Sequence, residues 1–203
     1  MSPQDIPSDA RFELPLDWKA RHFQAMSLVM RLPDRTLAPE TKQKAQDLTD
    51  QARFDEAIAV IEADPGWELS PEALNVVGNA YAGKGEEERA RDFYERARDA
   101  ARNWSAVFMS KVENNLGYID LVQGRYTEAI KGFDLAIELS ATWPMPWVNK
   151  IAALRLSGRD RELEALANDL YQRWPDWKAS PDFAERLYND PYVTESVRRL
   201  LLR

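Results

Sequence analysis

Residues 74–97 read LNVVGNAYAGKGEEERARDFYERA, and residues 113–136 read ENNLGYIDLVQGRYTEAIKGFDLA. In both stretches a glycine, Gly85 or Gly124, is followed by alanine after five residues, an aromatic residue after nine and alanine after twelve. Both stretches also carry a glycine seven residues earlier. Small and aromatic residues that recur in this way indicate stacked helix–turn–helix units.

Two weaker copies flank this pair. Gly158 is followed at the same offsets by Leu163, Ala167 and Leu170. Upstream, the segment 52–57 (ARFDEA) mirrors residues 124–129 (GRYTEA), with alanine in the place of glycine. The positions five residues after each turn are separated by 33, 39 and 34 residues, and they are Ala57, Ala90, Ala129 and Leu163. Such a period, near ~34 residues, predicts an array of repeats rather than a single pocket.

The pattern resembles the tetratricopeptide repeat family, over roughly residues 38–176. The best-matching unit supplies Leu74, Val77, Gly78, Tyr81, Gly85, Ala90, Tyr94 and Ala97. The next supplies Leu116, Gly117, Gly124, Ala129, Phe133 and Ala136, but has Glu113 for a large apolar residue and Asp120 for tyrosine. The last supplies Trp147, Gly158 and Pro175, with Lys150 and Ile151 in place of Leu-Gly.

The resemblance implies an all-α fold, a right-handed α-solenoid of helix–turn–helix repeats with N-terminal and C-terminal capping helices. The units are expected at 38–70, 71–104, 110–143 and 144–176. Residues 1–15 are expected to form a flexible arm, 16–37 an N-terminal helix, and 177–203 the capping helices that cover the last apolar face. In the N-terminal helix, Phe23, Met26, Val29 and Met30 recur at helical spacing before Pro33.

Five extra residues separate the second and third units, around residues 102–106. Since this segment lacks glycine and proline, we expect longer helices rather than a longer loop. Trp104 could then cover the surface near Glu113, and the carboxylates of Glu113 and Asp120 could form salt links to Lys150 or Arg155.

Net charge and the distribution of apolar residues argue against some classes of partner. The net charge of −7 argues against nucleic acid as a partner. No run of 18 apolar residues is present, and no secretory leader is recognisable, so we expect a cytoplasmic protein without membrane insertion. Arginines at 89, 91, 96, 98 and 102 alternate with acidic residues and predict a solvated convex face.

Catalysis has little support in the sequence. With no cysteine and His22 as the single histidine, the usual nucleophile and metal-ligand clusters cannot be assembled. The glycines fit the repeat pattern rather than a phosphate loop. We therefore expect no catalytic residue, no metal and no cofactor, and place His22 in helix packing.

The resemblance implies that the first helix of each unit lines a concave groove. Asparagines recur there at matched offsets, and an amide can hold a peptide backbone through one acceptor and two donors. The peptide-groove candidates are Asn75, Asn79, Lys111, Asn114, Asn115, Tyr118, Asn149 and Arg155. Some family members hold a chaperone's C-terminal carboxylate with two asparagines and three basic residues. Here Asn75, Met145 and Asn149 occupy the basic positions, so that role is not expected.

Two interpretations of function follow. The first is a protein-interaction module (an adaptor, scaffold or assembly factor) that binds a peptide or helix of another protein in the groove. The second is self-association into a homo-oligomer through tryptophans without a repeat role, Trp143 and Trp177, which could equally be core residues. A small enzyme is a distant third.

Overall fold

The computed structural model describes residues 37–101, 105–143 and 145–173 of the chain. The expected N-terminal arm, most of the N-terminal helix and the expected capping helices lie outside these residues. So do His22, Trp104 and Trp177. Every regular element within the described ranges is helical, which confirms the all-α prediction for this part of the chain.

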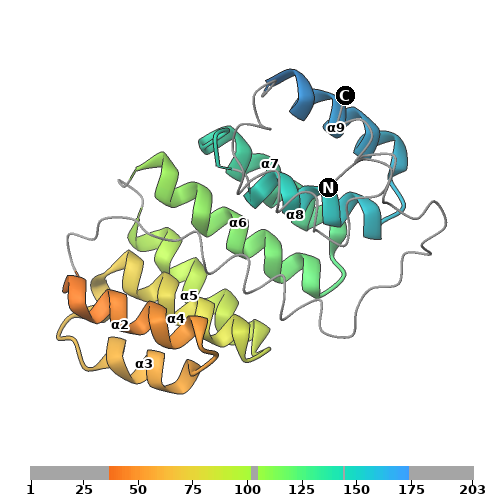
Figure 1. The fold of residues 1–203 in the computed structure, drawn as a ribbon. Coiled ribbons are helices and arrows are strands. Elements are labelled where there is room, and N and C mark those ends of the chain that lie inside the picture. The colour runs from red at the N-terminus through yellow and green to blue at the C-terminus, as the bar shows by residue number, and fades with distance from the viewer. Residues whose placement is uncertain (1–36, 102–104, 144, 174–203) are drawn as a thin grey trace, which may run out of the picture.

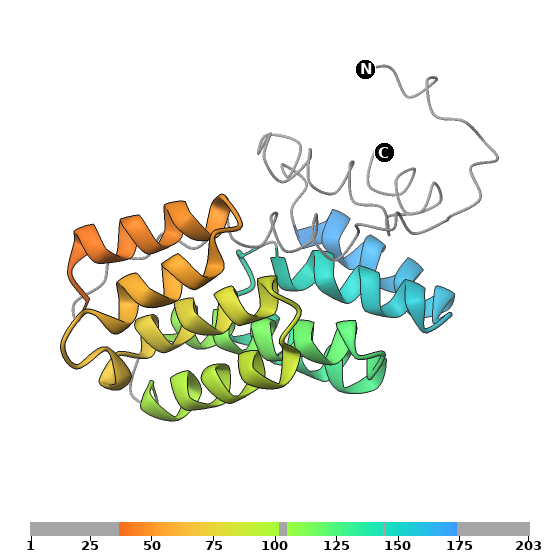
Figure 2. The ribbon, with the colours of Figure 1, turned by 90° about the horizontal axis from the view of Figure 1, so that it is seen from below.

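The helices follow one another as four antiparallel pairs (Figures 1 and 2). The pairs are α2 (Pro39–Asp50) with α3 (Phe54–Glu62), α4 (Pro71–Gly83) with α5 (Glu87–Ala100), α6 (Ala106–Val122) with α7 (Tyr126–Leu139), and α8 (Met145–Leu156) with α9 (Asp160–Arg173). A short 3-10 turn, η2 (Trp67–Leu69), joins the first two pairs. The stacked pairs form an α-solenoid, as expected.

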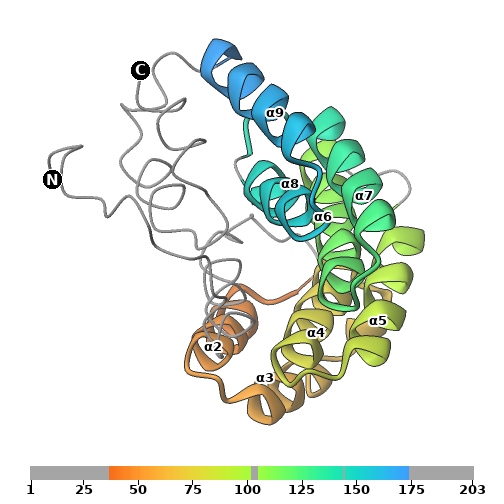
Figure 3. The same ribbon diagram turned by 90° about the vertical axis from the view of Figure 1, so that its right-hand side faces the viewer.

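Successive pairs stack into a curve. Figure 3 shows α2, α4, α6 and α8 along the inside of this curve, with α3, α5 and α7 outside. Each inner helix packs against its own outer partner and against the next inner helix. We call the side of α4, α6 and α8 that points away from the outer helices the inner face.

One turn geometry is repeated in all four pairs. Gly85, Gly124 and Gly158 adopt φ of 73°, 75° and 69°, and Ala52 takes the same place with φ of 57°. The amide that follows each of them donates to a carbonyl five residues earlier, for example Arg125 N to Asp120 O at 2.9 Å. This Schellman-type bond ends each inner helix and starts its outer partner at a fixed angle.

Small residues bring the two helices of a pair into close contact. A Cβ added at Gly78 would lie 2.6 Å from Cε1 of Tyr94, and one added at Gly117 would lie 2.8 Å from Cε1 of Phe133. Both rings are fully buried. The glycines therefore make room for the aromatic side chains that fill the space between helices.

The extra residues between the second and third pairs lengthen a helix, as expected. Helix α6 has 17 residues, against 13 in α4, and begins before the expected unit start at Ser110. Ser105 caps α6 by accepting a hydrogen bond from Phe108 N. No helix in the described part of the chain is long and apolar enough to span a membrane.

Candidate peptide-binding face

Five asparagines on three inner helices form one hydrogen-bonded line. We call them the amide strip: Asn75 and Asn79 on α4, Asn114 and Asn115 on α6, and Asn149 on α8. Their offsets within the repeats place them side by side when the pairs stack. The strip therefore follows the direction of stacking and crosses three successive units.

The hydrogen bonds of the amide strip all run in one direction, with donors on the α8 side and acceptors on the α4 side. Asn149 Nδ2 donates to Asn114 Oδ1 at 2.8 Å, and Asn114 Nδ2 lies 3.4 Å from Asn115 Oδ1. Asn115 Nδ2 then donates to Asn75 Oδ1 at 3.0 Å and to Asn79 Oδ1 at 3.1 Å. Both donors of the Asn115 amide are thus used within the protein. The sequence predicted these residues on the groove side, but not that they would bind one another.

Tyr94 anchors the end of the strip to the core. Its hydroxyl, on outer helix α5, donates to Asn79 Oδ1 at 2.8 Å. Burial of the ring raises the pKa of Tyr94 well above its usual range, so it stays a neutral donor. Tyr94 was recognised in the sequence only as a core ring. A buried tyrosine needs a partner for its hydroxyl, and that requirement was the available signal.

Lys111 lies one turn before Asn114 and Asn115 on the same side of α6. The side chain is buried, and burial lowers its pKa to about 8, with the charge of Lys42 acting in the same direction. Its Nζ lies 5.8 Å from the centre of the Trp143 ring. No carboxylate in the described ranges forms a salt bridge with it. The inner face thus carries a buried ammonium group, that of Lys111, which lies over the ring of Trp143.

Trp143 belongs to the core. It is 9% exposed, packs in the larger hydrophobic cluster, and has its Nε1 buried without a hydrogen-bond partner. This placement corresponds to the core alternative rather than to an exposed anchor. Tyr118 is also buried, and burial raises the pKa of its hydroxyl.

The carboxylate partners differ from those expected. Asp120 pairs with Arg91 at 2.5 Å and with Arg125 at 2.7 Å, so it connects α6 to the preceding unit rather than to Lys150 or Arg155. That expectation was wrong for Asp120, because its place at the end of α6 faces α5 and the turn. For Glu113, burial raises the pKa, and the charge of Arg98 acts in the opposite direction.

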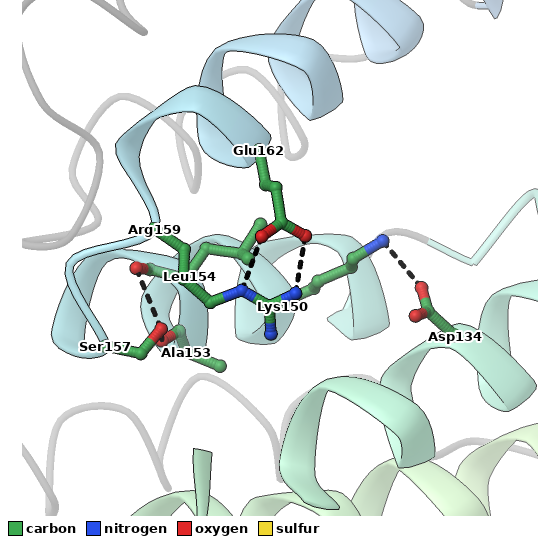
Figure 4. Close-up of polar contacts among 7 residues, drawn as sticks. All are labelled: Asp134, Lys150, Ala153, Leu154, Ser157, Arg159 and Glu162. Carbon is green, nitrogen blue, oxygen red and sulfur yellow. Dashed lines mark hydrogen bonds and ion pairs between the residues drawn. The ribbon is translucent and has the colours of Figure 1, made fainter. Parts of the chain in front are cut away.

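The two cations of the last pair bind elsewhere. Lys150 Nζ reaches back to Asp134 on α7 at 2.6 Å (Figure 4). Arg155 lies 3.2 Å from Asp160 at the start of α9, so this groove candidate sits at the end of α8 rather than beside the amide strip. Figure 4 also shows Arg159 bound through two nitrogens to Glu162, which fixes the turn. These contacts stabilise the repeat rather than form a site.

The arginines of α5 are mainly solvated or paired, as the sequence predicted. Arg89 pairs with Glu86 and lies over the Tyr81 ring, while Arg96 lies over the Phe93 ring. Arg91 is the exception, since it reaches Asp120 of the next unit. These side chains therefore support the packing between pairs and show no built anion site.

Comparison with known proteins bears on the fold. No protein-family model matches the sequence. No curated protein matches it. Among solved structures, "MamA MSR-1 C2" matches 79% of this chain and 94% of its own, with a TM-score of 0.52 and 19% sequence identity. Identity this low concerns the fold alone. The similarity supports the helical solenoid fold of this chain.

Proposed function

We propose that this chain is a protein-interaction scaffold that binds a segment of a partner protein along its inner face. The observation that supports this is the amide strip with Lys111 at its side. Asn75 and Asn114 share one offset within their units, and Asn115 and Asn149 share the next, so these groups form a polar track across three units rather than scattered surface residues. We place this interaction in the cytoplasm and assign no catalytic residue to the chain.

The chemistry of the track favours a ligand rich in acceptors. Asn79 accepts two hydrogen bonds through Oδ1, but its Nδ2 donates none within the described residues. Asn114 uses one of its two N–H groups on Asn115. Lys111 can only donate. Backbone carbonyls or a carboxylate of a bound segment would satisfy all three groups.

The remaining contacts would come from apolar residues beside the track. Met145 and Val148 on α8 occupy groove positions next to Asn149 and are buried, and Val122 at the end of α6 is partly exposed. A peptide with alternating apolar side chains could place them here while its carbonyls meet the amides. The hydrogen bonds would contribute roughly 0.5–1.5 kcal/mol each, so several are needed for stable binding.

The test is site-specific photo-crosslinking in the cells that make the protein. A benzoylphenylalanine at Val122 reports on the inner face, and one at Lys131, exposed on outer helix α7, is the matched control. We expect a defined adduct from position 122 that is absent from position 131. Adding Lys111→Met should reduce its yield while circular dichroism stays unchanged. Identical adducts from both positions, or a yield that does not respond to Lys111→Met, would contradict the proposal.

Self-association through Trp143 and Trp177 was the second interpretation of the sequence. Of the two tryptophans assigned to it, Trp143 is buried and Trp177 lies outside those ranges.

A further inference from the structure

Two donors near the middle of the inner face lack an acceptor. Nε1 of Trp143 is buried without a hydrogen-bond partner. Lys111 forms no salt bridge within residues 37–101, 105–143 and 145–173, and the neighbouring charge that acts on it, that of Lys42 on α2, is also positive. An indole N–H and an ammonium group can only donate. Because a buried donor without an acceptor is destabilising, an acceptor placed between the two groups would be bound favourably.

The two donors lie close enough to share one acceptor group. Lys111 Nζ is 5.8 Å from the centre of the Trp143 ring. The indole nitrogen belongs to that ring, so the two nitrogens lie roughly 4–8 Å apart, which one carboxylate can bridge with two hydrogen bonds of about 2.8 Å each. The pair therefore has the geometry of a small anion site.

The indole of Trp143 is held in place by the segment around it. Trp143 N donates to Ser140 O at 3.2 Å, and Nε1 of Trp147 donates to Ala141 O at 3.1 Å. The Trp143 ring itself packs in the larger hydrophobic cluster. A ring packed in this way has little freedom to turn its N–H toward another acceptor.

We propose that Lys111 and Trp143 together bind a carboxylate of the partner's segment, supplied by an aspartate or glutamate side chain. The entering group must be small, since Lys111 is 5% and Trp143 is 9% exposed. A carboxylate is small and offers two acceptor oxygens to two donors. This inference rests on the proposed function and adds the class of residue that the bound segment must carry.

The position of the pair favours a side chain over a chain end. Lys111 is on α6, the middle one of the three helices that carry the amide strip, so a segment bound along the strip continues past it in both directions. A side-chain carboxylate branches from a continuing chain, whereas a C-terminal carboxylate would end it there. Lys111 also stands at none of the three positions, here Asn75, Met145 and Asn149, at which some tetratricopeptide proteins carry the basic residues for a C-terminal carboxylate.

The test uses pools of short peptides, acetylated at the N-terminus and amidated at the C-terminus, with glutamate or glutamine fixed at each position in turn. Binding to the immobilised full-length protein is measured for the wild type, Lys111→Met and Trp143→Phe. Lys131→Met, on the exposed side of outer helix α7, is the matched control. One further pool has a free C-terminal carboxylate and no acidic side chain. Circular dichroism of each variant comes first.

We expect glutamate to be preferred over glutamine by roughly tenfold at one position, because hydrogen bonds to a charged group are the stronger kind. The preference should disappear in Lys111→Met, decrease in Trp143→Phe and persist in Lys131→Met. In a proton–nitrogen NMR spectrum of the wild type, which does not depend on the folding of any variant, a glutamate peptide should shift the Nε1–H signal of Trp143 and its glutamine analogue should not. The Nε1–H signal of Trp147, which is already bound to Ala141 O, should stay in place.

The possible failures are distinguishable. Peptide binding without a preference for glutamate, or a preference that survives Lys111→Met, would overturn this inference and leave the proposed function standing. Preferred binding of the free C-terminal carboxylate would overturn the assignment to a side chain. Absence of binding by every pool would also overturn it, and the photo-crosslink from position 122 would then show whether the proposed function fails as well.

Discussion

The hydroxyl of Tyr94 donates a hydrogen bond of 2.8 Å to Oδ1 of Asn79, which also accepts one from Asn115 of the next unit. One carbonyl oxygen thus connects an outer helix, its inner partner and the following repeat. The core ring and the polar track are parts of the same network. A substitution of Tyr94 should therefore affect the amide strip, and a substitution in the strip should affect the packing of Tyr94.

Replacing Asn115 by aspartate should destabilise the protein more than replacing it by alanine. The aspartate has the same shape, but puts an acceptor where the Nδ2 group faces the oxygens of Asn75 and Asn79. Alanine removes the two hydrogen bonds that Asn115 donates and the longer one that it accepts from Asn114, and should lower the free energy of unfolding by roughly 1–3 kcal/mol. Urea unfolding at pH 7 measures both. Protonation of the aspartate in acid should reduce the difference in stability between the two variants. If Asn115→Asp is no less stable than Asn115→Ala, these amides are not paired in this way.

Gly78→Ala should lower the free energy of unfolding by about 1–3 kcal/mol, since its Cβ would overlap the buried Tyr94 ring. The control is a double-mutant cycle with Tyr94→Ala. In that background the added methyl group meets no ring, so the loss from Gly78→Ala should shrink. Strictly additive effects would argue against the contact.

Ala52→Gly should stabilise the first unit. Ala52 has φ of 57°, a left-handed conformation that is unfavourable by about 1–2 kcal/mol for a residue with a Cβ. Part of this gain is offset because glycine makes the unfolded chain more flexible. We expect a net gain of roughly 0.5–1 kcal/mol in thermal or urea unfolding. Gly124→Ala, at the same place in the third unit, should instead lower the free energy of unfolding. A steric clash would not be the cause, because a Cβ there meets nothing within 4 Å.

The turn at Ala52 also shows how far the sequence could predict the fold. Repeat spacing placed all four turns, including the one without glycine, because small and aromatic residues at fixed offsets have a local structural cause. The hydrogen bonds of the amide strip could not be predicted in the same way. They depend on the rotation of α4, α6 and α8 relative to one another, which no local pattern contains.

The same limit applies to burial. Asn115 and Lys111 were predicted on the groove side, where a solvated or ligand-facing side chain was expected, and both are buried. Trp143 had no repeat role and could be either surface or core. Whether Trp143 lies at the surface or in the core depends on how the chain between α7 and α8 packs against α6, which is a tertiary contact.

Lys111→Met should stabilise the protein near neutral pH, and the gain should shrink as the pH rises. The folded-state pKa of Lys111, about 8, lies below its ordinary value of 10.5, because burial disfavours the charged form. Between these values the unfolded chain binds more protons than the folded one, so the wild-type free energy of unfolding rises with pH. Below pH 8 the full penalty is present, and above pH 10.5 it is gone.

The size of the effect follows from the width of that window. The stabilisation by Lys111→Met cannot exceed about 3 kcal/mol. Loss of the interaction between Lys111 and the Trp143 ring offsets roughly 0.5–1 kcal/mol of it. Urea unfolding of both proteins at pH 7, 8.5 and 10 gives the difference directly, because every other titrating group is common to the two. We expect the advantage of the variant to fall by about 1–3 kcal/mol over this range. A difference that stays constant with pH would mean that Lys111 is solvated in the folded protein and that its place on the inner face is open.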